Sequence, residues 1–199
     1  MIFKTMVFNS NLELVETLTY GAEQMIPTHD GKLLLFAHIG PNNKTIVVLN
    51  PRLVEIQRKE ISTHCERPLQ VGSQQFYCLG STSTSWDAKT NETAEMRWLR
   101  YSSVGIVLHD GRLVVSRTET NASEIAVYEK PVFGKESRKV ARLQELLLSR
   151  WDNSLMEVKS GVVAFQGAND KLIIWDVDRN LVTKHQLPPN GFLRCFVFE

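Results

Sequence analysis

The sequence of 199 residues has few cysteines and none of the spacings that bind metal ions. Its three cysteines, Cys65, Cys78 and Cys195, are an odd number with no short paired spacing. This usage is typical of reduced thiols in a cytosolic or nuclear protein rather than of a disulfide framework. His64-Cys65 has no partner at metal spacing, and no Cys-x-x-Cys or clustered carboxylates occur, so we expect no metal site.

Long apolar runs are also missing from the chain. No stretch of 18 apolar residues exists, which excludes a membrane-spanning helix. The stretch from Met1 to Leu18 carries Lys4, Glu13 and Glu16 and lacks the apolar core of a signal peptide. The sequence therefore predicts a cytoplasmic or nuclear protein without a membrane partner.

The sequence has no concentration of positive charge of the kind that binding to a polyanion requires. The 23 basic and 22 acidic residues are interspersed and leave a net charge of +1. Binding to nucleic acid or to an anionic membrane requires a basic stripe or patch. We therefore expect no nucleic-acid partner.

Catalytic motifs are absent as well. His29-Asp30 and His109-Asp110 resemble acid–base pairs, but neighbours in a turn or strand point apart, and both dipeptides lie where a hairpin turn is needed. No glycine-rich phosphate loop and no Gly-x-Ser-x-Gly nucleophile elbow occur. We nominate no catalytic, cofactor-binding or metal-binding residue, expect no cofactor, and predict that the protein is not an enzyme.

Three Asn-x-Ser/Thr triplets, at Asn43, Asn91 and Asn121, lie in turns expected between strands. In a secreted protein they would be candidates for glycosylation. Without a signal peptide we interpret them as turn residues, and the sequence leaves open whether they ever carry glycans.

A repeat is present. Apolar strands ending in a large apolar residue plus a polar one recur in steps of 41, 37, 42 and 47 residues. These endings are Phe8-Asn9, Leu49-Asn50, Trp86-Asp87, Tyr128-Glu129 and Trp175-Asp176. A period of this length is typical of β-propeller blades.

A second repeated feature, a glycine at a turn before each strand ending, tests this period. Gly31, Gly72, Gly111 and Gly161 lie 18, 14, 17 and 14 residues before the last four endings, and each precedes a run with strand character. Asp-Gly favours a tight hairpin turn because glycine accepts a positive φ without steric cost.

The runs between these marks predict an all-β chain of four complete four-stranded blades in a single domain, residues 1–199, which is either whole or a fragment of a larger propeller. Within it we expect a strand at Met96 to Tyr101, a short helical insertion at Arg142 to Ser149 and hairpins at the marked glycines. A partial blade shared by the termini would place Ile2 to Phe8 and Leu12 to Tyr20 beside Phe192 to Phe198.

The segment from Gly161 to Asp176 resembles the second half of a WD40 repeat, in which a Gly-led strand, a polar turn and a strand ending in Trp-Asp follow one another. Asn43 to Asn50 is similar, with Leu-Asn in place of Trp-Asp. The Gly-His dipeptide that opens such repeats is absent, so the family's Asp-His-Ser-Trp hydrogen-bond set is not carried over. The resemblance implies a rigid propeller that binds peptides or proteins through its inter-blade loops.

A weaker resemblance links Trp86 to Asn91, followed by Trp98, to the Asp-Ala-x-Thr-Gly…Trp docking segment of quinoprotein-type propellers, with Asn91 replacing the glycine. In either family such tryptophans lock neighbouring blades. We therefore expect Trp86, Trp98 and Trp175 to pack between blades rather than to contact a ligand.

Three functions remain open. A protein-interaction module or scaffold is favoured; a quinoprotein- or lactonase-type enzyme and an adaptor fragment needing further blades are the alternatives. An open arc of blades would leave apolar flanks for a partner chain or an oligomer to cover. The residues that bind are not identified. The apolar residues expected to be buried are Ile46, Val48, Ile125, Val127, Leu172 and Ile174.

Overall fold

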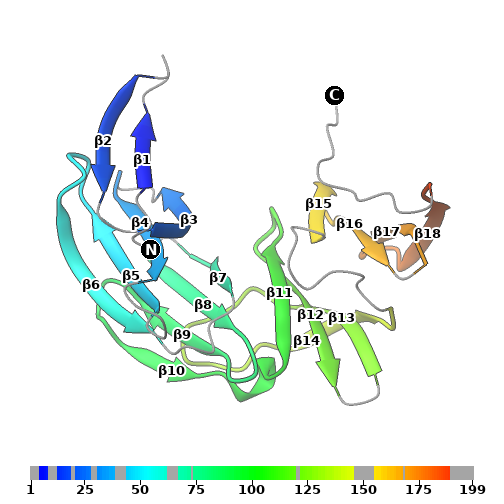
Figure 1. Cartoon of the computed structure of the whole chain (residues 1–199). Coiled ribbons are helices and arrows are strands. Elements are labelled where there is room, and N and C mark those ends of the chain that lie inside the picture. The colour runs from blue at the N-terminus through cyan, green and yellow to red at the C-terminus, as the bar shows by residue number, and fades with distance from the viewer. Residues whose placement is uncertain are drawn as a thin grey trace. The chain divides into compact units, whose positions relative to one another are not determined.

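The structure, a computed structural model, describes residues 5–8, 13–18, 21–27, 31–38, 44–61, 67–72, 74–119, 122–145, 155–167 and 169–188. These residues form 18 β-strands and one turn of 3-10 helix, η1 (Arg97–Leu99). The strands make one two-stranded and four four-stranded sheets, all antiparallel between neighbours (Figure 1). The chain divides into two compact units, Met1–Cys65 and Glu66–Glu199.

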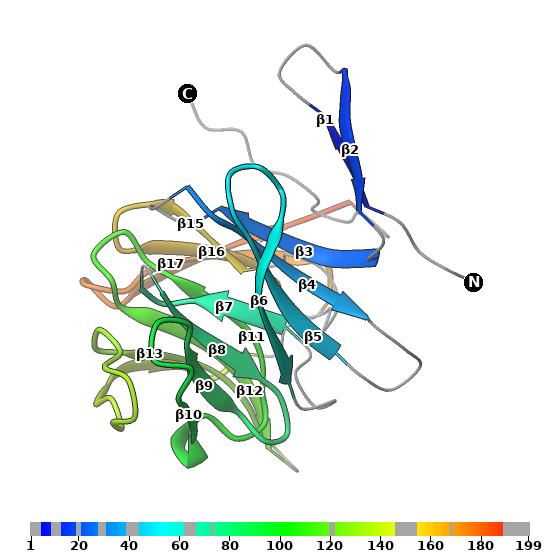
Figure 2. The ribbon, with the colours of Figure 1, turned by 90° about the vertical axis from the view of Figure 1, so that its left-hand side faces the viewer.

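The first unit contains a hairpin and one four-stranded sheet (Figure 2). The hairpin pairs β1 (Thr5–Phe8) with β2 (Leu14–Leu18). The sheet consists of β3 (Gly21–Pro27), β4 (Leu33–His38), β5 (Lys44–Leu49) and β6 (Glu55–Ile61). Its core includes Leu35, Val47 and Leu49, and Leu18 of β2 packs against them, so the hairpin is anchored to this sheet.

The second unit contains three four-stranded sheets, in each of which the strands follow one another in sequence order. The first has β7 (Arg67–Gln70), β8 (Gln75–Leu79), β9 (Thr84–Asp87) and β10 (Thr93–Glu95). The second has β11 (Ser102–Val107), β12 (Leu113–Glu119), β13 (Ala122–Tyr128) and β14 (Lys139–Leu143). The third has β15 (Leu155–Lys159), β16 (Val162–Gly167), β17 (Lys171–Asp176) and β18 (Leu181–Gln186).

The predicted division into four four-stranded blades with a leading half blade is confirmed. Each expected strand-ending pair in the described blades closes the third strand of its sheet, as β17 does at Trp175-Asp176. The expected trailing strand, Phe192 to Phe198, lies outside the described residues. The shared terminal blade therefore stays a prediction.

One local prediction is wrong, and a second is wrong in its first residues. The segment Met96 to Tyr101 is not the fourth strand of its blade, because β10 ends at Glu95 and the chain then turns through η1. Met96 and Leu99 are both buried, and their spacing of three residues places them on one side of a 3-10 turn. The predicted helical insertion does not begin at Arg142, because Arg142 and Leu143 belong to β14. Its later residues, 146–149, lie outside the described part of the chain.

The polar residue that ends the repeated strand caps the turn that follows. Asp87 Oδ1 accepts hydrogen bonds from the backbone N–H groups of Lys89 at 2.8 Å and Thr90 at 3.0 Å. Asp176 Oδ1 accepts one from the N–H of Arg179 at 3.0 Å. Short polar side chains favour such turns because they satisfy backbone donors that the strand no longer pairs.

The tryptophan before each of these aspartates reaches the same turn. Trp86 Nε1 donates to Asn91 Oδ1 at 3.2 Å, and Trp175 Nε1 donates to Asn180 Oδ1 at 3.4 Å. Both asparagines adopt a positive φ, 61° and 52°, which asparagine tolerates better than most residues. For Asn91 this supports the turn interpretation of its Asn-x-Thr triplet; Asn43 and Asn121 lie outside the described residues.

The repeated glycines also lie in turns of the structure. Gly31, Gly111 and Gly161 have φ values of 76°, 88° and 73°, whereas Gly72 is not among the positive-φ glycines of the described chain. At Gly111 the backbone N–H donates to Leu108 O at 2.8 Å, which closes the expected hairpin turn.

The sheet β11–β14 is covered on both faces by its neighbours in the second unit. Residues of one face, among them Leu113, Val115 and Ala126, share a core with Tyr77 and Leu79 of β8. Residues of the other face share a core with the sheet β15–β18; this cluster includes Val114, Ile125, Val127, Val163, Phe165, Ile173 and Trp175. Burial of both faces explains why β12 begins as an unbroken apolar run rather than an alternating one.

One glycine allows the inner strands to approach. A Cβ on Gly105 of β11 would lie 2.7 Å from Leu79 Cδ1 and 3.2 Å from Leu69 Cδ2. Both leucines belong to the neighbouring sheet β7–β10. A side chain at this position would force both leucines and the backbone of Val114 to shift, so glycine favours the close packing of β11 against that sheet.

The predicted core is correct for Ile46, Val48, Ile125 and Val127, each at most 4% exposed. It is wrong for Leu172 and Ile174, which are only half-buried. Ile173 and Trp175 alternate with them along β17 and are the residues that pack toward the sheet β11–β14. Alternation predicts that one face is buried, but it does not say which face meets the larger neighbour.

Cys78 contradicts the prediction of reduced thiols, because its sulfur takes part in a disulfide bond. The other cysteines, Cys65 and Cys195, lie outside the described residues. The cysteines consequently no longer favour a cytosolic or nuclear compartment. The compartment itself stays a prediction.

A separate observation concerns membranes. Within the described ranges, no helix has the length and apolar character needed to cross a bilayer.

The burial of Trp175 predicts a large loss of stability on truncation. Its side chain is 0% exposed in the core between two sheets. Trp175→Ala should lower the free energy of unfolding by about 3–5 kcal/mol in urea titrations, because it leaves a cavity as well as losing apolar contacts. Leu181→Ala, at a residue 61% exposed on β18, is the control and should change it by less than about 0.5 kcal/mol. An unchanged melt for Trp175→Ala would contradict this packing.

The disulfide of Cys78 predicts a thiol count. Protein unfolded without reductant should show one reactive thiol per chain, and reduced protein should show all three cysteines. In Cys78→Ala the unreduced count should rise to two, because the former partner is released. Three thiols in unreduced wild-type protein would show that the bond does not form.

Candidate binding site

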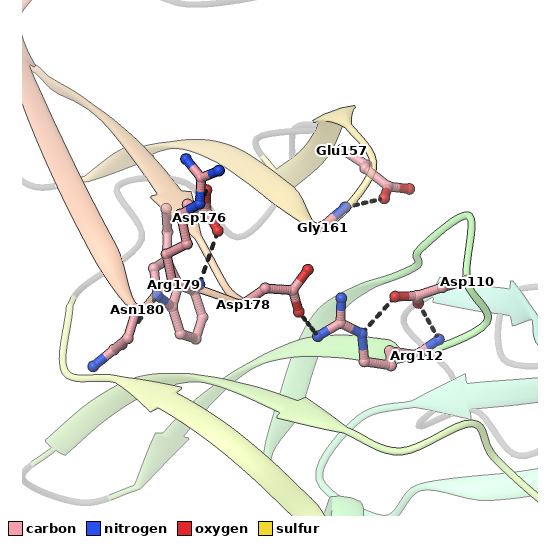
Figure 3. Close-up of polar contacts among 9 residues, drawn as sticks. Asp110, Arg112, Glu157, Gly161, Asp176, Asp178, Arg179 and Asn180 are labelled. Atoms are coloured by element: carbon pink, nitrogen blue, oxygen red, sulfur yellow. Dashed lines mark hydrogen bonds and ion pairs between the residues drawn. The ribbon is translucent and has the colours of Figure 1, made fainter.

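A polar network joins the turns of the sheets β11–β14 and β15–β18. Arg112, immediately before β12, lies between Asp110 and Asp178 (Figure 3). Its Nε is 2.6 Å from Asp110 Oδ2, and its Nη1 is 2.7 Å from Asp178 Oδ1. Asp178 follows β17, so one guanidinium connects turns that are 66 residues apart in sequence.

Glu157 of β15 connects the same two sheets through their backbones. Its Oε1 accepts a hydrogen bond from the N–H of Gly161 at 2.9 Å, and its Oε2 accepts one from the N–H of His109 at 2.6 Å. Gly161 is closely packed, since a Cβ there would lie 2.5 Å from Asp178 Oδ2. A side chain at position 161 would displace the Asp178 carboxylate that pairs with Arg112, and the φ of 73° there also favours glycine.

This network engages the carboxylate of Asp110, the acidic member of the dipeptide His109-Asp110, with Arg112. The carboxylate of Asp110 also accepts the backbone N–H of Arg112 at 2.9 Å, so Arg112 engages both of its oxygens. Burial acts to raise the pKa of Asp110, but the hydrogen bonds and charge of Arg112 together lower it below the ordinary value. Asp110 is thus a charged anchor for Arg112 rather than a partner for the histidine. His29-Asp30 and His64-Cys65 lie outside the described residues.

A groove of about 520 Å³ lies on the face of the sheet β11–β14 that packs against the sheet β7–β10. It is lined by Trp98, Arg117, Tyr128, Glu136, Ser137, Arg138 and Lys139. Trp98 comes from η1, Arg117 from β12 and Tyr128 from β13, and the remaining residues come from the β13–β14 connection and the start of β14. The groove therefore lies where the core between two blades reaches the surface.

Aromatic rings form one wall of this groove. The ring centroids of Trp98 and Tyr128 are 4.9 Å apart at an interplanar angle of 62°, and those of Trp98 and Tyr77 are 6.3 Å apart at 82°. Such edge-to-face contacts fix ring positions. Burial raises the pKa of Tyr77 to about 12, and within the described chain its hydroxyl has no hydrogen-bond partner. Trp98 packs against the core, as predicted for blade packing, but it also lines the groove.

Two cations of the groove lining, Arg117 and Lys139, share one carboxylate, that of Glu124. Glu124 Oε1 lies 2.6 Å from Lys139 Nζ and 3.6 Å from Arg117 Nη1. The side chains are 20%, 35% and 15% exposed, respectively, so the set is largely shielded from water. Lys139 Nζ also lies 5.9 Å from the centroid of the Tyr128 ring, and Arg117 Nη1 donates to the Tyr128 hydroxyl at 3.4 Å. The positive groups thus lie against the aromatic wall.

Arg138 differs from these two cations because it is at the rim. Its side chain is 76% exposed and pairs with Glu129, which is 47% exposed. Arg138 Nε donates to Glu129 Oε1 at 3.0 Å, and this hydrogen bond and charge raise the pKa of Arg138. Glu129 is the polar strand-end residue of its blade; where Asp87 and Asp176 cap a turn, Glu129 binds the rim arginine.

The lining of the groove combines cations with aromatic rings. No histidine or cysteine belongs to its lining, and the described part of the chain has no cluster of three or more His, Cys, Asp or Glu side chains placed to hold a metal ion. Cationic donors beside aromatic faces suit a planar or anionic group.

The groove residues were missed at the sequence level, although a signal was present. Between Arg97 and Arg142 the chain has nine basic and five acidic residues, a local excess that the overall charge of +1 conceals. Their convergence depends on a pairing across β12 and β13, where Arg117 is opposite Glu124. Residues this far apart in sequence cannot be assigned to one face without that register.

The pKa of Asp110 predicts a pH-dependent contribution to stability. A carboxyl group whose folded pKa is lowered stabilises the fold above its unfolded pKa of about 3.9, and this contribution is lost as the pH falls through the folded value. Asp110→Asn should therefore be less stable than wild type near neutral pH, and the difference should disappear as the pH falls below the lowered pKa of Asp110. Urea unfolding across this pH range measures it.

Arg112→Ala provides the matched control for that measurement. In the Arg112→Ala background, Asp110→Asn should cost less at neutral pH, because the hydrogen bonds and charge that lower the pKa of Asp110 are largely gone. Equal costs with and without Arg112 would contradict the assignment.

Comparison with known proteins gives a fold but no family. No family model and no curated protein matches the sequence. A protein from Lactobacillus plantarum is similar in structure, with a TM-score of 0.58 over 92% of this chain at 13% identity. The extracellular domain of a hybrid two-component system from B. thetaiotaomicron has a TM-score of 0.55 over 95% at 8% identity. BamB from Moraxella catarrhalis has a TM-score of 0.50 over 88% at 11% identity.

The chain spans 63%, 24% and 56% of those three structures, less than two thirds of each. At these identities the similarity is one of fold alone. With four antiparallel four-stranded blades, it confirms the predicted propeller, whereas the finer WD40 resemblance has no family match. The chain is all-β and has a β-propeller fold.

Proposed function

We propose that this chain is a protein-interaction module that holds a segment of a partner protein in the groove beside Trp98, Tyr128 and Arg138. The observation that carries the proposal is the combination of a half-buried tryptophan with cations at one open groove. Tryptophan, tyrosine and arginine are the residue types that contribute most to protein interfaces.

The rigidity of the groove supports binding. Trp98 lies between two tyrosine rings, and Arg117 and Lys139 are held by Glu124. Side chains already held in place lose less conformational entropy when a ligand arrives. The groove therefore resembles a preorganised recognition surface.

An array of defined peptides of about 15 residues, varied in charge and apolar content, tests the proposal. Purified protein should bind a subset saturably, and Trp98→Ala should weaken that binding at least about tenfold, as expected for a central aromatic contact. Trp98→Phe should retain part of it, because an aromatic face remains. Thermal melts of both variants report whether they are folded.

Tyr101→Ala is the control. Tyr101 is an aromatic residue 55% exposed, close to Trp98 in sequence but not part of the groove lining. Its replacement should leave peptide binding unchanged. Absence of saturable binding to any peptide, or equal losses for Trp98→Ala and Tyr101→Ala, would overturn the proposed function.

A further inference from the structure

Arg138 is the groove cation that a ligand can recruit most easily. Its ion pair with Glu129 joins two side chains that are 76% and 47% exposed. Ion pairs this exposed contribute little, because water and salt screen them and both long side chains retain alternatives. A carboxylate offered by a ligand can therefore replace Glu129 with little loss.

The inner cations are bound differently. Arg117 and Lys139 share Glu124, and all three side chains are at most 35% exposed. Removing one member of such a shielded set would leave charge poorly compensated, so it resists exchange. Its role toward a ligand is to keep Lys139 against Tyr128 and to add positive potential.

The aromatic wall demands a second feature of the ligand. Trp98 is half-buried and lines the groove, whereas the Tyr128 ring is only 3% exposed and supports the indole from the core side. An aromatic side chain placed there would gain edge-to-face or stacked contacts at no cost in buried polar groups. Acidic groups alone would leave this wall uncovered.

The surroundings add a field of the same sign. The stretch that supplies the groove, Arg97 to Arg142, has nine basic and five acidic residues, although Arg97 and Arg100 at its start both pair with Glu95 just before it. Such a local excess steers acidic partners and rejects basic ones.

Resting on the proposed function above, we infer that the groove recognises an acidic segment of a partner protein that carries an aromatic residue. A carboxylate of the segment replaces Glu129 on Arg138, while the aromatic side chain packs against the half-buried indole of Trp98, which the Tyr128 ring supports.

Fluorescence anisotropy with labelled peptides of about 12 residues tests this inference. One peptide contains Asp and Glu around two Phe residues; the second has Asn and Gln at the acidic positions; the third has Leu for Phe; the fourth has Lys for the acidic residues. The acidic aromatic peptide should bind at least about tenfold more tightly than the neutral one. Its affinity should fall as salt is raised from about 50 to 300 mM, because the contact is screened.

Glu129→Gln gives the sharpest result, because it should tighten binding of the acidic peptide about two- to fivefold by removing the competing carboxylate. Arg138→Ala should weaken binding about five- to tenfold. Arg179→Ala is the matched control, since Arg179 is also 76% exposed and lies 3.9 Å from a carboxylate, that of Asp176. It should leave the affinity unchanged.

The outcomes separate this inference from the proposed function. If the neutral or Lys peptide binds as well as the acidic one through Trp98, the function stands and the acidic preference is wrong. Weaker binding by Glu129→Gln would also overturn the exchange at Arg138. If a single-stranded oligonucleotide of equal charge binds more tightly than the acidic peptide, the ligand of the groove is nucleic acid and the inference is wrong. No binding by any peptide would overturn both proposals.

Discussion

The second unit depends on the burial of both faces of the sheet β11–β14. Leu113, Val114 and Val115 point alternately to its two sides, and all three are 0% exposed. Neither side could face water without a large loss of apolar burial, so a blade on each side is a condition for the sheet to be stable. Gly105 serves the same requirement by letting β11 approach the neighbouring sheet.

The polar contacts of the fold lie where this apolar burial ends. At the turns, Arg112 and Glu157 connect sheets whose strands are already packed, and Glu157 also accepts hydrogen bonds from the backbone N–H groups of His109 and Gly161. On the opposite face of β11–β14, the inter-blade core gives way to Arg117 and Glu124. The groove thus originates from the packing of two blades, and its aromatic wall is the outer edge of their shared core.

The repeated strand ending has a sound physical basis, although its cause is visible only in the turns. Asp87 and Asp176 cap the following turn, and the preceding tryptophans donate to asparagines in the same turns. These contacts are local, so their residue types recur at fixed spacing and can be recognised in a sequence. At Tyr128-Glu129 the ending looks similar, but Glu129 binds Arg138. A pattern can therefore place a turn without revealing what its polar residue does.

The sequence by itself determined the all-β class, the four blades and most strand positions, because hydrogen-bonded hairpins and capped turns depend on neighbours within a few residues. It did not reveal the buried face of β17, the turn at Arg97–Leu99 or the disulfide of Cys78. Nor could it assemble the groove, in which Trp98, Arg117 and Lys139 meet from three parts of the chain. Only the tertiary structure decided these features, because they depend on strand register and on which blade packs against which.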